Sequence, residues 1–232
     1  MIDSRQHVYL ERMGIAVWVR RTGQLSESDN SVVSLAINIR GTDAANMDWQ
    51  TLEQHVSTCT DCALHANRKQ AVFGTGNQSA EWMIIGEAPG AEEDKLGLPF
   101  VGRAGKLLDA MLKAAGYERD DVFIANILKC RPPRNRDPKP NEAAACSQYL
   151  HRQIALVRPK IILAVGRIAA QNLLATDAPL GRMRGKIHRH EPSGTPVIVT
   201  YHPAYLLRSP LEKRKAWEDL CFARRVCREV EP

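Results

Sequence analysis

The sequence predicts an α/β protein of three layers, in which helices cover both faces of a central four-stranded parallel sheet. Four short apolar runs, rich in β-branched residues, are spaced along the chain as buried parallel strands are. The runs are WMIIG (82–86), VFIANIL (122–128), KIILAVG (160–166) and PVIVTY (196–201). Helical patterns separate the runs, and this alternation favours a parallel sheet between helices over an antiparallel one.

The expected helices have recognisable ends. Residues 105–116 repeat apolar side chains three and four positions apart and close with Gly116, while 141–157 begins at the good cap Asn141. Further helices are expected at 167–174, 47–59 and 211–230. A basic hairpin over 180–195 is expected to lead into the last strand.

Residues 1–46 are predicted to be an N-terminal extension of unknown role, and residues 47–232 to be the main domain. The extension carries two β-like runs joined by a polar stretch, and none of its residues suggests chemistry.

The composition limits the classes of protein to which the chain can belong. The 232 residues are 44% hydrophobic, which is enough for a core without disulfides. No apolar run approaches the roughly 18 residues that span a bilayer, and no secretory signal is recognisable, so we expect a cytoplasmic protein whose cysteines are reduced thiols or metal ligands. We also expect a monomer. Residues 1–130 hold 13 Lys/Arg and 17 Asp/Glu, whereas 131–232 hold 19 and 9. The basic half indicates either a solvated surface or a polyanionic partner.

Residues 84–102, IIGEAPGAEEDKLGLPFVG, concentrate carboxylates and one aromatic residue in what we expect to be a loop after the first strand. A second unusual feature is the spacing of four cysteines, Cys59-x2-Cys62 followed by Cys130-x15-Cys146. Paired thiolates can hold zinc, all-thiolate ligation equally suits a four-iron cluster, and buried apolar cysteines are the third reading. For Cys221 and Cys227 we expect ordinary core or surface positions.

Several motifs together resemble the family-four, iron–sulfur uracil-DNA glycosylases of bacteria and archaea, from about residue 47 to 228. They are GEAPG (86–90), PFVGRAG (99–105), IANILKCRPP (124–133), HPAYLLR (202–208) and the four-cysteine spacing. The resemblance implies an enzyme of the bacterial cytosol or nucleoid that flips uracil out of DNA and hydrolyses its glycosidic bond. It also implies a 4Fe–4S cluster on the four cysteines, with zinc as the less favoured metal.

The resemblance assigns three residues to the flipped base. Phe100 stacks on uracil, Asn126 selects it by its amide, and His202 donates to the uracil 2-oxygen as charge grows there. From the residues alone, a core Phe, an Asn that caps a loop and a His in a surface turn are the alternatives.

The resemblance also places Glu87 and Ala88 in the turn after the first strand, where Glu87 helps hold uracil or water. Family-one enzymes carry an aspartate at the position of Ala88, so activation of water is expected to depend less on one strong base. Glu93 and Asn135 match positions that support the pocket.

DNA contacts are expected from the basic half. Leu206 is a candidate wedge for the base stack, although a core position for Leu206 or its neighbour is an equal alternative. Arg208, Arg184 and Lys186 are candidate phosphate contacts.

Two other functions remain open. A covalent uracil-DNA binder of the same superfamily carries an inserted basic loop, which does not interrupt residues 129–146. A non-catalytic iron–sulfur DNA-binding or polymerase-associated module would share the fold, but this chain combines Glu87, Phe100, Asn126 and His202.

Overall fold

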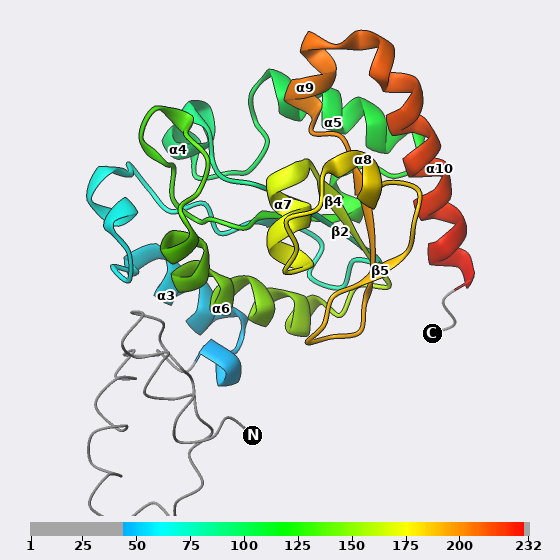
Figure 1. Cartoon of the computed structure of the whole chain (residues 1–232). Coiled ribbons are helices and arrows are strands. Elements are labelled where there is room, and N and C mark those ends of the chain that lie inside the picture. The colour runs from blue at the N-terminus through cyan, green and yellow to red at the C-terminus, as the bar shows by residue number, and fades with distance from the viewer. Residues whose placement is uncertain (1–43, 230–232) are drawn as a thin grey trace, which may run out of the picture. The chain divides into compact units, whose positions relative to one another are not determined.

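A six-stranded sheet in the order β1-β3-β2-β4-β6-β5 forms the centre of the computed structural model, which describes residues 44–229 (Figure 1). The strands are β1 (Thr75–Gly76), β2 (Trp82–Gly86), β3 (Phe123–Asn126), β4 (Ile161–Val165), β5 (His188–Arg189) and β6 (Pro196–Thr200). The four inner strands run parallel, and the two-residue strands β1 and β5 pair antiparallel at the edges. The predicted four-stranded parallel sheet is confirmed, with one short strand added at each edge.

Helices cover both faces of the sheet, so the predicted three layers are confirmed. The α-helices are α3 (Trp49–Thr58), α4 (Ala91–Leu96), α5 (Arg103–Ala114), α6 (Pro140–Val157), α7 (Arg167–Leu173), α8 (Leu180–Met183), α9 (Pro203–Arg208) and α10 (Lys213–Glu229). Short 3₁₀ helices complete the described chain: η2 (Ala44–Asn46), η3 (Ala63–Asn67), η4 (Arg119–Asp121), η5 (Pro133–Asn135) and η6 (Pro210–Glu212). Helices α6, α7 and α8 pack on one face, and α5 and α10 pack on the other.

The inner strands are almost entirely apolar, apart from Asn126 and Thr200 at their carboxyl ends, because both of their faces are buried. Ile84 pairs with Ile124 on one side and with Leu163 on the other, and all three side chains point to the α5 and α10 layer. Each is 0% exposed, and burying such a side chain contributes about 1.5–3 kcal/mol. The neighbouring strand residues alternate to the α6 and α7 layer, so the continuous apolar runs of the sequence are explained.

A third apolar cluster lies beside the sheet, between α3, η3 and α6. Leu52, Val56 and Leu64 are almost fully buried there, and so is Ala44 of η2. Because Ala44 packs into this cluster, the main domain begins slightly before the predicted boundary between residues 46 and 47. The remainder of the predicted extension, 1–43, lies outside the described residues.

One expected loop is a helix instead. Residues 91–96 form α4, which begins after Gly90 and ends at Gly97 with a left-handed φ of 73°. The acidic residues fall in its first turn, where carboxylates interact favourably with the helix dipole. The acidic run that suggested a loop is therefore a helix start.

The expected basic hairpin is present in its second half only. β5 and β6 pair antiparallel, and His190 N donates to Thr195 O across the turn (2.9 Å). The first half of the segment is the single helical turn α8. Within residues 44–229, none of the helices combines the length and the apolar character that crossing a bilayer requires.

Candidate active site

Three strand ends bring polar side chains together at the carboxyl edge of the sheet. Glu87 directly follows β2, Asn126 is the last residue of β3, and His202 lies two residues after β6. Ile127 N donates to Gly86 O (2.9 Å), which ties the end of β2 to the chain leaving β3. Open parallel sheets bind ligands at this edge, so the sheet itself places the candidate site.

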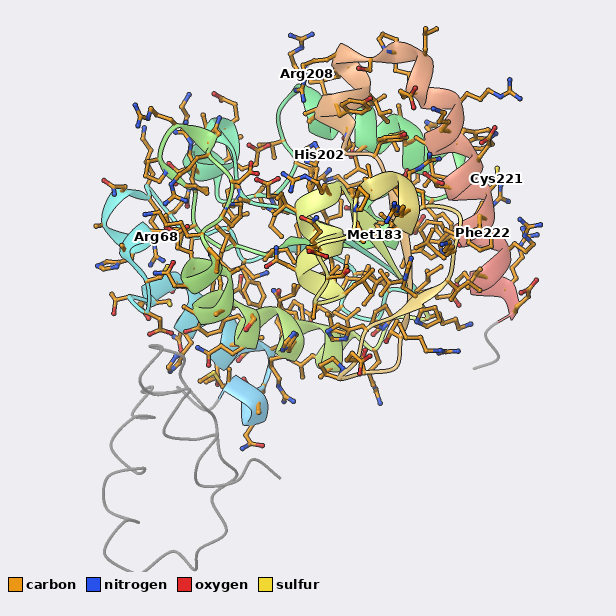
Figure 2. All side chains as sticks on the ribbon, viewed as in Figure 1. Arg68, Met183, His202, Arg208, Cys221 and Phe222 are labelled. Carbon is orange, nitrogen blue, oxygen red and sulfur yellow. The ribbon has the colours of Figure 1, made fainter. Side chains whose placement is uncertain are left out.

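A cavity of about 470 Å³ opens at this edge. The predicted residues that line it are Glu87, Ala88, Glu93, Phe100, Asn126, Asn135, His202 and Arg208. In Figure 2 His202 lies where α9 begins and Arg208 at its far end. Arg136, Asp137 and Tyr205 also line the cavity, and we did not predict them. Tyr205 follows the HPA motif directly, whereas nothing in the sequence separates Asp137 from the other charges of its loop.

Phe100 forms one wall of the cavity in a strained conformation. Its φ is 52°, in the left-handed region that bulky residues rarely adopt. Two glycines make room for it: a Cβ at Gly86 would lie 2.6 Å from Phe100 Cζ, and one at Gly105 would lie 1.7 Å from Phe100 O. The Phe100 and His202 ring centroids are 5.6 Å apart, with 31° between the ring planes. The ring is thus fixed beside the imidazole.

Glu93 on α4 holds the turn that carries Phe100. Its Oε1 accepts hydrogen bonds from Val101 N (3.0 Å) and Gly102 N (3.2 Å), while its Oε2 accepts from Gly90 N (3.1 Å). One carboxylate therefore joins the start of α4 to the start of α5. This geometry explains why the sequence carries the acidic Glu93 seven positions before the aromatic Phe100.

Asn126 presents an unpaired acceptor to the site. The residue is only 2% exposed, and its Oδ1 has no hydrogen-bond partner. Leaving a buried acceptor unpaired costs about 1–3 kcal/mol, which a ligand with a matching N–H would recover. A Cβ at Gly86 would lie 2.4 Å from this oxygen, so Gly86 makes room for both the amide and the Phe100 ring.

His202 is prepared to donate from Nε2. Its Nδ1 accepts a hydrogen bond from Ala204 N (3.1 Å), so the proton of the neutral ring is on Nε2. Burial, with a smaller contribution from the positive charge of Arg208, lowers the pKa of His202 to about 4. The imidazole is therefore neutral at pH 7.

Glu87 has an unusual acidity. Burial raises its pKa to about 7, and the negative charge of Asp137 acts in the same direction. Arg167, at the start of α7, opposes this rise and forms an ion pair with Asp137 (Nη2–Oδ2, 3.0 Å). The protonation of Glu87 thus changes near neutral pH, and two residues that we did not predict adjust it.

Asn135 belongs to a tightly turned loop. Asn135 and Arg134 both have positive φ, 53° and 56°, and Asn135 Oδ1 accepts a hydrogen bond from Arg131 Nε (2.7 Å). Arg136 on the same loop is bound by both carboxylate oxygens of Glu142 (2.8 and 2.6 Å). The loop that closes this side of the cavity is therefore held by its own polar contacts.

The structure corrects the position of the wedge. Leu206 is 0% exposed, because the buried side of α9 packs toward α5. Leu206 is therefore a core residue, which was the alternative to a wedge. Leu207 is 36% exposed and Tyr205 37%. An apolar side chain available to DNA at this helix is therefore Leu207 or Tyr205.

Arg184 is also placed differently from the prediction. Its guanidinium is bound by both carboxylate oxygens of Asp219 (2.7 and 2.9 Å) and lies 4.5 Å above the Tyr201 ring centroid. With Asp219 3% exposed, this pair joins α8 to α10 rather than offering a free cation to phosphate. Arg208 and Lys186 are exposed, as phosphate contacts need to be.

The four predicted ligand cysteines line one small pocket between α3, η3 and α6, with a cavity volume of about 10 Å³. They are Cys59, Cys62, Cys130 and Cys146. In the described chain, no three Cys, His, Asp or Glu side chains gather closely enough to hold one metal ion. A tetrahedral zinc site brings sulfurs within about 4 Å of one another, whereas each sulfur of a four-iron cluster binds a different iron. Cys221 is exposed and Cys227 buried.

Cationic and N–H donors face these sulfurs. Arg68 Nη1 donates to Cys130 Sγ (3.0 Å), and Lys129 N donates to Cys146 Sγ (3.3 Å). Burial nonetheless raises the pKa of Cys146 to about 12 and also raises that of Cys130. Buried thiolates therefore need more positive charge than the protein supplies, and a bound metal group would supply it.

Comparisons with known proteins agree with this geometry. Residues 73–221 match the family model described as the uracil DNA glycosylase superfamily. A type-4 uracil-DNA glycosylase of Archaeoglobus fulgidus is 42% identical over 77% of this chain and 93% of its own length. Those of Pyrobaculum aerophilum and Thermotoga maritima are each 44% identical, over 76% and 69% of this chain and 93% and 83% of their own lengths.

The match spans the strand ends that build the cavity, and it extends over nearly the whole length of the relatives. The chain therefore belongs to the type-4 family of the uracil-DNA glycosylase superfamily.

Proposed function

We propose that this protein is a monofunctional uracil-DNA glycosylase, which hydrolyses the bond between uracil and deoxyribose and leaves an abasic site for base excision repair. The unpaired Oδ1 of Asn126, buried beside the Phe100 ring and His202, carries the proposal. It is an acceptor built to meet an N–H of a planar ligand. The names of the relatives support uracil as that ligand.

Selection follows from the amide. Asn126 Oδ1 accepts from uracil N3–H, and its amide nitrogen donates to the uracil 4-oxygen, while Phe100 stacks on the ring. Cytosine carries an amino group and a bare nitrogen at these two positions, so both contacts are reversed. Each mismatch costs about 1–3 kcal/mol in a buried site.

Catalysis acts on the leaving group. When the bond between C1′ and uracil N1 breaks, the electron pair stays on uracil, and His202 Nε2–H donates to the 2-oxygen where negative charge grows. A fixed donor of this kind is worth about 10²–10³ in rate. Water adds to C1′ and loses a proton, which neutralises the departing uracil anion. Glu87 as a carboxylate orients this water or the base from the turn after β2.

DNA binding uses the exposed basic groups. Arg208 at the rim of the cavity and Lys186 contact phosphates, which release condensed counterions on binding. Because Leu206 is buried, Leu207 takes the proposed place of the wedge beside the flipped base. The enzyme acts as a monomer in the cytoplasm.

The four cysteines would hold a 4Fe–4S cluster. The shared pocket of the four cysteines and the donors that face their sulfurs support such a group. When bound, the cluster supplies a covalent link between the α3–η3 segment and the β3–α6 segment, so its binding free energy becomes folding free energy. The cysteine site and the substrate cavity are lined by different residues, so we assign the cluster a structural role and no step of the hydrolysis.

The test is cleavage of a uracil-containing oligonucleotide after alkali, with a cytosine oligonucleotide of the same sequence as the control. We expect cleavage at uracil alone, and strongly reduced cleavage by Asn126→Asp, which has lost the amide donor. A heat-stable protein–DNA adduct in place of cleavage would identify a covalent binder. Binding of DNA without cleavage or adduct would identify a non-catalytic module.

A further inference from the structure

Lys129 is a buried cation between the two sites. It is 1% exposed, and its Nζ donates to Asn126 O (3.0 Å) and to Gln153 Oε1 (2.6 Å). Both acceptors are neutral, and among the described residues 44–229 no carboxylate forms an ion pair with it. A buried ammonium without an opposite charge is costly, so an anion near it would stabilise the charged form.

The groups that act on the charge of Lys129 are the sulfurs of Cys146 and Cys130, which become anions when they bind a metal. Lys129 lines the cysteine pocket, its own backbone N donates to Cys146 Sγ (3.3 Å), and Cys130 is the next residue. Arg68 contacts the same group of sulfurs from the other direction, through Cys130 Sγ (3.0 Å). Four thiolates carry more negative charge than a zinc ion or an iron–sulfur core neutralises, so two flanking cations match the excess.

The segment from Asn126 to Cys130 connects this charge to the substrate cavity. Asn126 presents its amide to the cavity, and its carbonyl accepts from the Lys129 ammonium three residues later. Gln153, the other acceptor, is fixed in turn because its Nε2 donates to Phe73 O (2.9 Å). The ammonium therefore holds the backbone of the uracil-selecting residue, while the backbone N–H of the same lysine donates to a sulfur of the cysteine pocket.

We propose that Lys129 is the counter-charge of the metal group held by the four cysteines and that, through the Asn126 carbonyl, it makes uracil recognition depend on that group. The proposal rests on the proposed function of the cavity and of the cysteines. Lys129 is a positioning residue, because it reaches uracil only through Asn126.

The test replaces Lys129 by Met, which keeps the length of the side chain and removes its charge. Lys113→Met is the matched control, because Lys113 is 76% exposed on α5. Three properties are measured: metal per chain and its rate of loss to a chelator, the midpoint potential of bound iron, and the affinity for free uracil. None of them requires that DNA be cleaved.

We expect Lys129→Met to lose metal faster and, where iron is bound, to have a lower midpoint potential, because removal of a cation favours the oxidised state. Its Kd for uracil should rise about tenfold, the size of one lost charge-assisted hydrogen bond. Lys113→Met should match the unmodified protein in all three properties. Lys129→Arg, which restores the charge, should recover metal retention.

If Lys129→Met keeps the metal retention and the midpoint potential of the unmodified protein, Lys129 is not the counter-charge of the metal group. A weakened metal site with unchanged uracil affinity would overturn the coupling. Should Lys129→Met fail to fold, Gln153→Leu replaces it: this variant removes one acceptor and keeps the charge, and unchanged uracil affinity in it would contradict the positioning role. If the unmodified protein binds uracil but never cleaves DNA, the proposed function fails while these measurements still decide the role of Lys129.

Discussion

The substrate cavity and the cysteine pocket differ in how their polar groups are satisfied. In the cavity, Asn126 Oδ1 lacks a partner, Phe100 has a positive φ and Glu87 has a pKa raised to about 7. In the cysteine pocket, Arg68 and Lys129 already donate to sulfur. Strain and an unpaired acceptor are typical of a site for a reversibly bound ligand, whereas donors already placed on sulfurs are typical of a site for a permanently bound group.

This difference predicts that changes in the cysteine pocket act mainly on stability, while changes in the cavity act mainly on rate.

The largest expected effect is the loss of a cysteine ligand. Cys146→Ala should abolish stoichiometric metal binding and destabilise the fold by on the order of 5 kcal/mol, since structural metal sites contribute about 10 kcal/mol or more in small peptides. Cys221→Ala, at an exposed position, should change stability by less than about 0.5 kcal/mol. Metal content and thermal unfolding measure both. Equal stability of the two variants would remove the structural role of the pocket.

Removal of the His202 imidazole should have the opposite effect: a large loss of rate with little change in metal content. His202→Ala should lower kcat about 10²–10³-fold, because the donor to the uracil 2-oxygen is lost. Metal content should stay the same, because His202 lies at the other site. Single-turnover cleavage of a uracil oligonucleotide measures the rate. A loss below about tenfold would mean that His202 does not stabilise the leaving group.

Gly86 tests the cavity by shape alone. A Cβ there would lie 2.4 Å from Asn126 Oδ1 and 2.6 Å from Phe100 Cζ, so Gly86→Ala should displace both groups. We expect kcat/KM to fall about 10- to 100-fold and stability by about 1–3 kcal/mol, as in other overpacked sites. Gly181→Ala is the control, because a Cβ at Gly181 meets no atom within 4 Å. Equal activity of the two variants would contradict the placement of the amide and the ring.

Much of this architecture could be predicted because it depends on local patterns. The inner strands are buried on both faces and therefore read as apolar runs, and parallel strands bring Glu87 and Asn126 to one edge wherever the helices lie. The family assignment is confirmed by the comparisons. The roles of the individual site residues stay predictions.

The predictions for individual side chains are wrong where segments distant in the sequence decide which side chains are buried or paired. Which of Leu206 and Leu207 faces the core depends on how the six-residue helix α9 docks against α5, and the sequence of α9 does not contain that information. The sequence predicts a free cation at Arg184, because its partner Asp219 is 35 residues away. Asp137 and Arg167 are likewise 30 residues apart. Only the helix α4 had a local signal, Glu93 three residues after Gly90 and then Gly97, which we read as a loop.

The smallest effect, and the one that best separates the two sites, is the pH dependence set by Glu87. Its pKa is raised to about 7, and the carboxylate is the form that orients water, so kcat/KM should fall about tenfold per pH unit below 7. Glu87→Gln should remove this dependence. His202 does not contribute above pH 5, because its pKa is lowered to about 4.

The free energy of unfolding should change with pH in the opposite direction to kcat/KM: it should rise as pH falls below 7. Since the folded state raises the pKa of Glu87, the protonated form stabilises the fold, and this contribution is lost as pH rises through 7. Glu87→Gln should therefore be more stable than the unmodified protein above pH 7, where it is also less active.

The neighbours of Glu87 should shift the midpoint of the profile in opposite directions. Arg167→Gln removes a positive charge that lowers the pKa of Glu87, so the midpoint should move to higher pH. Asp137→Asn removes a negative charge that raises this pKa, so the midpoint should move to lower pH. Because the two side chains form one ion pair, a purely structural role would disturb both variants alike. Profiles of kcat/KM from pH 5 to 9 that shift in the same direction would therefore refute electrostatic control of Glu87.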